Sequence, residues 1–440
     1  MADLLVTGKY LVSIDDDHTI IDNGGLAITG DTITAVGPAD ELRGRYPGAE
    51  ELYEPHGLIM PGLVNVHTHA AMACFRGLAD DLELMQWLQE YIFPAESNLT
   101  GEVVYWSTML SICEMIRSGT TSFCDMYLFA AEVARAAADA GMRAWIGEVL
   151  YDFPSPSYGE LENGFACCEK LFATYATHPL ITITLDPHAV YTCSPELLVR
   201  LGELAREKEA LYVIHLAETE VEVATCLERY GVRPVQHLEQ LGLLGPGMVA
   251  DHCVQLTGEE IELMAERGVG VAHCPESNMK LASGIAPVPD MLAAGLAVGL
   301  GTDGAASNND VDMFGEMSSA ALIHKGSRLD PTVMDARTTL HMATRGGARV
   351  LQAGERIGSL EPGKKADCIV LDLHQPHLTP LYNPLSHLVY AARGGDVVHS
   401  IINGRIVMRD RQLTTVKEAE VFGAMDRISR EIGKIKGNRS

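Results

Sequence analysis

The sequence predicts an α/β protein in which a (β/α)8 TIM barrel over residues 58–355 carries a small β-sandwich domain built from residues 1–57 and 356–415. Three observations support this fold class. Short strands and turns fill both ends of the chain, strands alternate with helices in the middle, and ionisable residues stand at the end of one strand after another.

The N-terminal segment begins the predicted β-sandwich with strands at Leu4–Val6 and Tyr10–Ile14. A hairpin follows, in which the strands Gly25–Ile28 and Thr32–Val36 flank the turn Thr29-Gly30-Asp31.

The last hundred residues return to the same pattern of short strands. A strand is expected at Ala366–Asp372, and residues 397–407 are expected to form a hairpin that turns at Asn403-Gly404. Because the two β-rich segments flank a different middle, they are expected to form one domain together. Residues 416–440 are expected to form a charged helix and a tail.

The middle of the chain alternates short apolar strands with amphipathic helices. Helix start signals include Ser194 before Pro195, and a capping box from Thr257 to Glu260. The alternation fits a parallel barrel or a doubly wound sheet, and no glycine-rich phosphate-binding motif follows a strand. The expected strands include Leu58–Met60, Ile181–Leu185, Leu211–Ile214 and Ala297–Leu300.

The composition excludes several classes of partner. The 440 residues include 59 acidic and 33 basic side chains, for a net charge of −26, whereas nucleic acids and anionic membranes require a basic surface. The chain begins without the basic and apolar segments of a signal peptide, and no apolar run is long enough to span a membrane. Ten scattered cysteines without a C-x-x-C pair indicate reduced thiols. These features predict a cytoplasmic enzyme that binds neither nucleic acid nor membrane.

The strongest local signal is the sequence Pro61-Gly62-Leu63-Val64-Asn65-Val66-His67-Thr68-His69. Residues two apart in a strand point the same way, so His67 and His69 would place two imidazoles together at the carboxyl end of a strand. Considered alone, the pair could also be two surface histidines in a loop.

Further ionisable residues end other apolar strands. His215 follows Leu211–Ile214, the pair Asp251-His252 closes the next strand, and Asp303 ends the stretch that begins at Ala297. Three imidazoles (His67, His69 and His215) and the carboxylate of Asp303 suit one Zn²⁺ or another divalent first-row metal ion per chain. The separation of His67 from Asp303 matches the length of one barrel.

Two more residues are candidates for proton transfer. Glu218 lies three residues after His215, where a carboxylate could act as a proton shuttle beside a metal-bound water. His252 could be a partner of that water or a fifth ligand, and its alternative is a structural core histidine. Glu220 and Glu222 are expected to be solvated, and the other histidines, including the strand-terminal His273, are expected to be structural.

Taken together, these motifs resemble a known family. The sequences P-G-L-V-N-V-H-T-H, H-L-A-E, the strand-terminal D-H, H-C-P-E-S-N-M-K-L and G-T-D-G-A-A-S-N-N resemble the amidohydrolase superfamily. Within it, the chain is most similar to the mononuclear aminohydrolases that include 5-methylthioadenosine/S-adenosylhomocysteine deaminases and related chlorohydrolases. The resemblance covers essentially the whole chain. It implies a barrel, a split β domain and one bound divalent metal ion, most simply Zn²⁺.

The resemblance also implies a substrate site. The segment from Arg76 to Glu96 resembles the substrate segment of adenosine-type deaminases, so that Glu96 would bind the ribose hydroxyls and Trp87 would pack against the nucleoside. His188 would also touch the substrate. On the residues alone, Glu96 could equally be an exposed helix-end residue and Trp87 a core aromatic.

One segment departs from some relatives that accept S-adenosylhomocysteine and hold its carboxylate with arginines. Gly147–Gly164 contains no arginine or lysine and four acidic residues, which would repel an anionic tail. Methylthioadenosine, 5′-deoxyadenosine and adenosine are therefore expected to fit better than S-adenosylhomocysteine.

The expected reaction is hydrolytic deamination at C6 of an adenosine-type nucleoside, which yields the inosine analogue and ammonia. Asp303 and His252 would orient the metal-bound water and take its proton, and Glu218 would protonate the purine. The same scaffold could instead hydrolyse a triazine, guanine or another heterocycle, and a more distant alternative is a non-catalytic amidohydrolase-like binding protein. A homo-oligomer is possible, since relatives are often dimers or tetramers.

Overall fold

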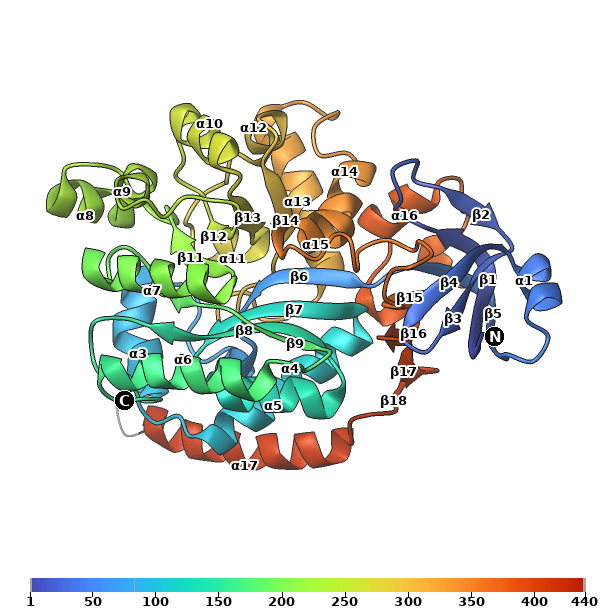
Figure 1. The fold of residues 1–440 in the computed structure, drawn as a ribbon, viewed down its shortest axis with the longest axis horizontal. Helices are drawn as coiled ribbons and strands as arrows, with labels where there is room; N and C mark the ends of the chain where they lie inside the picture. Colours follow the sequence, from blue (N-terminus) through green and yellow to red (C-terminus); the bar gives the residue numbers. More distant parts are fainter. Residues whose placement is uncertain (1, 83, 438–440) are drawn as a thin grey trace.

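The computed structural model describes residues 2–82 and 84–437, which are divided between a parallel barrel and a mixed sheet at one end of it (Figure 1). The barrel strands form two parallel ladders, β10-β8-β7-β6 with β9 also paired to β8, and β11-β12-β13-β14. They are β6 (Leu63–Thr68), β7 (Thr120–Tyr127), β8 (Arg143–Leu150), β9 (Ile181–Ile183), β10 (Asp186–Pro187), β11 (Tyr212–Leu216), β12 (Met248–His252), β13 (Gly270–His273) and β14 (Ala297–Leu300).

Hydrogen bonds join the two ladders on both sides. On one side, Leu185 pairs with Tyr212 in a parallel bridge between the fourth and fifth strand positions. On the other, the Asp303 N–H donates to the His67 carbonyl at 3.0 Å, and the Thr302 N–H donates to Asn65 Oδ1 at 3.0 Å. The ladders therefore surround one interior, as the predicted TIM barrel requires.

Helices cover the outside of the barrel. The predicted start signals are confirmed, because Ser194 accepts the Leu197 N–H and Thr257 with Glu260 forms a capping box. The helices are α4 (Gly101–Arg117), α5 (Ala130–Ala140), α6 (Leu161–Tyr175), α7 (Pro195–Lys208), α8 (Glu220–Tyr230), α9 (Pro234–Gln240), α10 (Gly258–Arg267), α11 (Pro275–Lys280), α12 (Val288–Ala293), α13 (Met313–Arg328), α14 (Ala336–His341) and α15 (Gly347–Val350). Between β6 and α4 the chain forms α2 (Leu84–Gln86), a π-helical turn (Trp87–Ile92) and α3 (Phe93–Glu96).

The two ends of the chain form a single mixed sheet in the order β18-β17-β16-β15-β5-β1-β3-β4, with β2 beside β1. The strands of the predicted β domain are thus hydrogen-bonded to one another without a break. They pack around an apolar core that is separate from the core of the barrel. Both predicted hairpins are present, as the pairs β3–β4 and β16–β17. The strands are β1 (Leu4–Val12), β2 (Ile20–Asp22), β3 (Gly24–Thr29), β4 (Thr32–Pro38), β5 (Glu50–Pro61), β15 (Cys368–Asp372), β16 (Val397–Ile402), β17 (Arg405–Arg409) and β18 (Gln412–Leu413). The helices α1 (Ala39–Arg45) and α16 (Pro384–Tyr390) belong to the same end segments of the chain.

The prediction that Leu58–Met60 is a barrel strand is wrong. These residues end β5, which pairs with β1 and β15 in the sheet of the chain ends, and β6 is the first barrel strand. Ile59 packs in the core of that sheet, whereas Leu58 and Met60 belong to the barrel core. A strand buried on both faces has the same apolar sequence in either setting, which explains the error.

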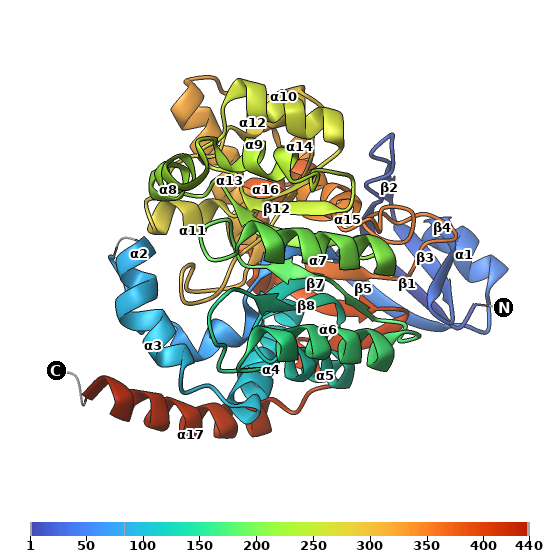
Figure 2. The ribbon, with the colours of Figure 1, turned by 60° about the vertical axis from the view of Figure 1, so that its left-hand side comes forward.

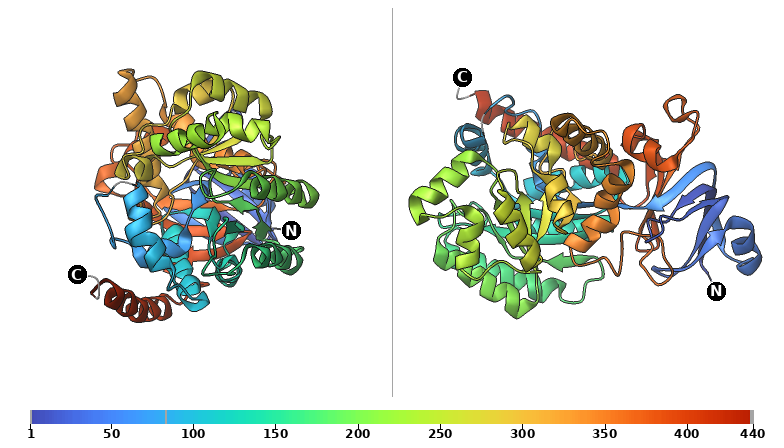
Figure 3. Two further views of the ribbon diagram at one scale, coloured as in Figure 1. Left: turned by 90° about the vertical axis from the view of Figure 1, so that its left-hand side faces the viewer. Right: turned by 90° about the horizontal axis from the view of Figure 1, so that it is seen from above.

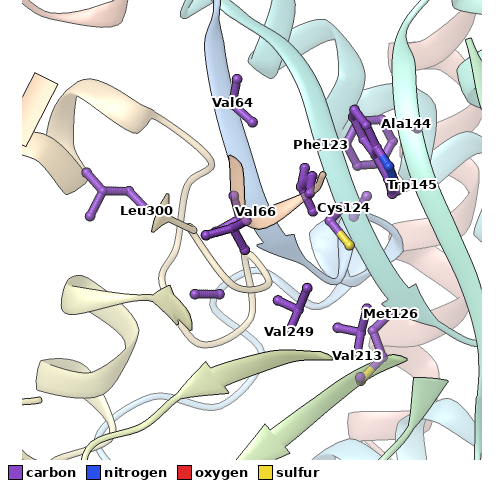
Figure 4. Close-up of a cluster of buried hydrophobic side chains, with 14 of the residues drawn as sticks. Val64, Val66, Phe123, Cys124, Met126, Ala144, Trp145, Val213, Val249 and Leu300 are labelled. Carbon is purple, nitrogen blue, oxygen red and sulfur yellow. The ribbon is translucent and has the colours of Figure 1, made fainter. Parts of the chain in front are cut away.

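The orientation of β6 fixes where a site can lie. β6 starts directly after β5, so the amino ends of all the parallel strands lie toward the chain-end sheet and their carboxyl ends point away from it (Figures 1 and 3). The barrel core is apolar, and Figure 4 draws the part contributed by β6, β7, β8, β11, β12 and β14.

The predicted C-terminal helix is α17 (Glu418–Gly437), and residues 438–440 of the predicted tail lie outside the described residues. Figure 2 shows α17 beside α4, where Arg117 makes a two-point ion pair with Glu418. All ten cysteines are free thiols, and most are buried, as the sequence predicts. Among the described residues, no helix has the length and apolar character that crossing a membrane requires.

A buried ion pair ties the barrel to the chain-end sheet and carries a stability prediction. Arg143, at the start of β8, donates from Nε to Asp367 Oδ2 at 2.7 Å and from Nη2 to Asn403 Oδ1 at 3.0 Å. Arg143→Ala is expected to lower the free energy of unfolding by about 3–5 kcal/mol, because it leaves the Asp367 carboxylate buried without its cation. Denaturant unfolding would measure the loss.

Lys365→Ala is the matched control, because Lys365 pairs with Asp31 at the surface, where an ion pair contributes about 1 kcal/mol or less. Equal losses in the two variants would contradict the role assigned to the buried pair.

Candidate metal centre and substrate cavity

The ionisable residues predicted from strand ends converge at the carboxyl end of the barrel. His67 lies in β6 and His69 directly after it, His215 lies in β11, His252 ends β12, and Asp303 follows β14. All but His69 are buried, and the His69 side chain is only 14% exposed. The structure therefore brings together every residue that the sequence predicts as a metal ligand.

Four ligand atoms face one another. His69 Nε2 lies 3.3 Å from His215 Nε2 and 3.3 Å from Asp303 Oδ1, and His67 Nε2 lies 3.7 Å from the same carboxylate oxygen. His67, His215 and His252 form a second group whose nitrogen atoms all lie within 4.8 Å of one another. His252 is thus close enough to be a fifth ligand or a partner of a metal-bound water.

The Nδ1 atoms of His69 and His215 are held by backbone carbonyls, which fixes the tautomers of these two rings. His69 Nδ1 donates to the Met126 carbonyl, and His215 Nδ1 donates to the His188 carbonyl at 2.8 Å. His67 Nδ1 lies 3.0 Å from Asp251 Oδ2. His69 and His215 therefore direct the lone pair of Nε2 toward the common centre, the arrangement that metal-binding histidines adopt.

The charge states of these groups also fit a metal ion. Burial lowers the pKa of His67 to about 4 and also lowers that of His69 and His215, so all three are neutral near pH 7. Burial would raise the pKa of Asp303, but the neighbouring imidazoles and the Ser277 hydroxyl lower it overall. In the described part of the chain, the buried Nε2 of His67 has no hydrogen-bond partner. Neutral imidazoles, one carboxylate and an unpartnered nitrogen are the donor set of a divalent metal site.

Three of these strand ends carry strained backbone. Ala217, His252 and Asp303 have φ angles of +51°, +68° and +61°, although none of them is glycine. Such left-handed residues cost free energy and concentrate at functional sites, where they direct side chains that a regular strand would point elsewhere.

Glu218 lies inside the site, as the sequence predicts. Its side chain is buried, its Oε1 accepts the Ser283 hydroxyl at 3.2 Å, and burial raises its pKa. A raised pKa favours the protonated carboxyl group, which can donate a proton.

The prediction that Glu222 is solvated is wrong, whereas Glu220 is exposed as expected. Glu222 is 3% exposed and accepts the backbone N–H groups of Ala217 and Glu218 at 2.9 and 2.8 Å. It thereby holds the left-handed turn that directs Glu218. The signal was the capping-box spacing from Thr219 to Glu222, because the N3 side chain of such a box turns back toward the helix start.

Asp125 was also missed by the sequence reasoning. Its Oδ1 accepts the Thr68 hydroxyl at 2.9 Å and the Ala70 N–H at 2.5 Å, so it fixes the backbone on both sides of His69. Asp125 lies inside β7, which continues to Tyr127, and not at the end of an apolar strand. The rule that site residues follow apolar strands therefore could not identify it.

A cavity opens beside these candidate metal ligands. The three residues that the family resemblance assigns to the substrate, Trp87, Glu96 and His188, all line it together with Glu218 and His252. The remaining lining residues are His69, Met72, Leu84, Leu88, Ile92, Phe93, Met126, Tyr127, Leu128, Val149, Tyr151, Tyr191, His215, Leu281 and Asp303.

Glu96 is neither an exposed helix end nor an isolated acid. The Tyr127 hydroxyl donates to its Oε1 at 2.7 Å, and burial raises the pKa of Glu96 to about 7. His188 Nδ1 forms a hydrogen bond of 2.8 Å with Thr192 Oγ1. Burial lowers the pKa of His188 to about 3. Both side chains are therefore fixed before any ligand binds.

The acidic residues of Gly147–Gly164 do not act as the sequence suggests, because none of them lines the cavity. Glu148 accepts the backbone N–H groups at the start of α5, Asp152 accepts from Ser194, and Glu162 pairs with Arg200. The prediction that no cation meets the tail of the substrate still agrees with the structure, but for another reason. Among the described residues that line the cavity, none is lysine or arginine.

Comparison with known proteins gives consistent results. The model of the Amidohydrolase family matches residues 58–407, and an imidazolonepropionase-like composite domain of bacteria matches residues 24–49. A curated relative from Syntrophobacter fumaroxidans, named 5-methylthioadenosine/S-adenosylhomocysteine deaminase, is 56% identical over 431 residues, which are 98% of each chain.

Two solved structures extend the comparison. An adenosine deaminase from Xanthomonas campestris with bound zinc superposes with a TM-score of 0.97 at 40% identity, covering 98% of this chain and 99% of that one. An atrazine chlorohydrolase from Arthrobacter aurescens TC1, complexed with zinc, gives a TM-score of 0.90 at 23% identity over 97% of this chain and all of that one. At that identity the second likeness shows a shared fold alone.

Proposed function

The chain belongs to the amidohydrolase family, and we propose that it removes the C6 amino group of an adenosine-type nucleoside by hydrolysis, releasing ammonia and the inosine analogue. It is a metal-dependent hydrolytic aminohydrolase, as its relatives are. One observation carries the choice of substrate: a fixed carboxylate, Glu96, and an aromatic ring, Trp87, share one cavity with the metal ligands and Glu218.

His67, His69, His215 and Asp303 are proposed to hold one divalent ion, with Zn²⁺ best suited to three imidazoles and a carboxylate. The bound ion would act as a Lewis acid that lowers the pKa of a water molecule at its open position. The facing Nε2 lone pairs and the unpartnered Nε2 of His67 support this assignment.

The side chains around the ligands supply the proton transfers. Glu218, whose protonated form is favoured by burial, would donate its proton to the ring nitrogen next to C6, which makes C6 more electrophilic. Asp303 and His252 would orient the attacking water and accept its proton. A C6–O bond forms, the C6–N bond breaks, and the accepted proton leaves with the amino group as ammonia. The remaining proton of the C6 hydroxyl group returns to Glu218, which leaves the C6 carbonyl and the protonated ring nitrogen of the inosine analogue.

Glu96 would recognise the ribose. A carboxylate oxygen can accept hydrogen bonds from both hydroxyl groups of a vicinal diol. Because Tyr127 already donates to Oε1, Oε2 remains available to the diol. Trp87 and His188 would contact the base and the sugar from the cavity wall.

The substituent at C5′ is proposed to be uncharged. Phe93, on the same helix as Glu96, and Tyr151 form an apolar part of the cavity wall, and Phe153 stacks on Tyr151 with ring centroids 4.0 Å apart. A methylthio group gains contact with such rings, whereas the carboxylate of a homocysteine tail would meet no cation among the described lining residues.

An ammonia-release assay on four nucleosides tests both proposals. Methylthioadenosine is expected to exceed S-adenosylhomocysteine in kcat/KM by about 10- to 100-fold, the cost of burying a polar group without a partner. Adenosine and 5′-deoxyadenosine are expected to react. Faster turnover of guanine or a triazine than of any nucleoside would contradict the nucleoside assignment.

Phe153→Arg, at the exposed edge of the aromatic wall, is expected to raise kcat/KM for S-adenosylhomocysteine relative to methylthioadenosine by about tenfold. Phe153→Gln is the matched control, since it removes the ring without adding a cation. Equal kcat/KM for the two nucleosides in the unmodified protein would overturn the proposal about the tail.

A further inference from the structure

The short helix α11 and the turn after it, residues 275–283, contact each of the three side chains to which proton transfer is assigned. We propose that this segment, called here the positioning segment, fixes their orientation through Ser277, Asn278 and Ser283. The proposal rests on the proposed deamination. None of these three neutral residues lines the cavity, so they act through the groups that they touch.

Ser283 acts on Glu218. Its hydroxyl donates to Glu218 Oε1 at 3.2 Å, and both side chains are 6% exposed. Because Oε1 accepts this hydrogen bond, the proton of the neutral carboxyl group belongs on Oε2. Ser283 therefore determines which oxygen of Glu218 donates, and in which direction.

Asn278 acts on His252. Its Oδ1 lies 2.9 Å from His252 Nδ1, and its side chain is 1% exposed. An amide oxygen only accepts, so Nδ1 carries a hydrogen atom, and in the neutral ring Nε2 is the nitrogen that keeps its lone pair. A lone pair on Nε2 allows His252 to accept a proton from a water molecule.

Ser277 acts on Asp303. Its hydroxyl donates to Asp303 Oδ2 at 2.6 Å, and Ser307 donates to the same oxygen at 3.0 Å. These two bonds occupy Oδ2, so Oδ1 faces His67 and His69.

The positioning segment also contacts the segment from Arg76 to Glu96, which resembles the substrate segment of adenosine-type deaminases. Lys280 donates to Asp80 Oδ1 at 2.6 Å and also to the Asn309 side chain, and Asp80 lies in the chain that leads to Trp87. Leu281 lines the cavity. The positioning segment thus contacts both the groups assigned to proton transfer and the segment that carries Trp87 and Glu96, so its variants should separate into two kinetic classes.

Steady-state kinetics on the preferred nucleoside tests this separation. Ser283→Ala and Asn278→Ala are each expected to lower kcat about tenfold, since each loses a hydrogen bond to an ionisable group, while KM stays within about twofold. Ser283→Thr restores the hydroxyl and is expected to restore most of kcat. Lys280→Ala is expected to raise KM more than it lowers kcat. Met279→Ala, exposed on the same helix, is the matched control and is expected to change neither.

Two readouts exclude a merely structural role. Metal content and the thermal unfolding midpoint are expected to stay unchanged in Ser283→Ala and Asn278→Ala. In ¹⁵N-histidine NMR spectra, the Nδ1-protonated tautomer of His252 is expected in the unmodified protein and a mixture of tautomers in Asn278→Ala.

Unchanged kcat in both variants would overturn the proposal, as would a loss that accompanies metal release or unfolding and is not rescued by Ser283→Thr. The NMR result does not depend on turnover. It therefore still tests the role of Asn278 if the unmodified protein releases ammonia from no nucleoside, an outcome that would overturn the proposed function instead.

Discussion

His215→Ala is expected to bind no divalent metal ion and to release no measurable ammonia from any nucleoside. His215 Nε2 lies 3.3 Å from His69 Nε2, and its loss would leave an incomplete donor set. Binding to a catalytic zinc ion lowers the pKa of a water molecule from far above neutrality to about 7, so the remaining protein groups cannot replace the metal. Mass spectrometry of bound metal and the ammonia-release assay would be measured on the same preparation.

His273→Ala is the matched control for this prediction. His273 also ends a barrel strand and is also buried, but its Nε2 lies 3.3 Å from His324 Nε2, apart from the metal ligands. This variant is expected to keep its metal ion. Metal loss in His273→Ala together with retention in His215→Ala would contradict the assigned ligand set. Dialysis of the unmodified protein against a chelator should abolish activity, and added Zn²⁺ should restore it.

Glu218→Gln is expected to lower kcat by about 10²–10⁴, the usual contribution of one general acid or base. The glutamine amide still fills the space and can still contact Ser283, but it cannot donate a proton to a ring nitrogen as a carboxyl group does. Metal content and the unfolding midpoint are expected to remain unchanged. Single-turnover rates of ammonia release would locate the loss in the chemical step.

Glu220→Gln makes the same chemical change two residues away, at an exposed position, and is expected to leave kcat unchanged. Unimpaired turnover by Glu218→Gln would remove Glu218 from the mechanism. A loss of equal size in both variants would point to a general effect on the loop after β11.

The convergence of the candidate metal ligands could be predicted from the sequence because two simple regularities locate these residues. Side chains two apart in a strand share a face, which places His67 beside His69, and parallel strands end at one edge, which brings His215 and Asp303 to them. Both regularities can be recognised from the short apolar stretch that directly precedes each residue. The split sheet was equally predictable, since the hairpins at both chain ends carry their own turn residues.

The residues that hold the site together could not be found in the same way. Asn278 and Ser283 are neutral, they belong to a short helix and a turn without periodicity, and their partners lie on other strands. Glu222 was misjudged although its capping-box spacing from Thr219 was visible, because its burial also depends on the left-handed turn at Ala217, which the spacing does not reveal. Leu58–Met60 was misplaced because an apolar run does not say which of two neighbouring cores it enters.

The position of β5 has a consequence for how the protein is made. β5 lies between β1 and β15, and β15 leaves the ribosome only after the entire barrel has been synthesised. During that interval the edge of β5 lacks the strand that finally covers it, and open strand edges promote association between chains. The Arg143–Asp367 pair likewise cannot form until the C-terminal segment arrives. The order of translation therefore makes the chain end the last part of this sheet that becomes available for docking, and a chain truncated before Asp372 would lack part or all of the strand that covers that edge.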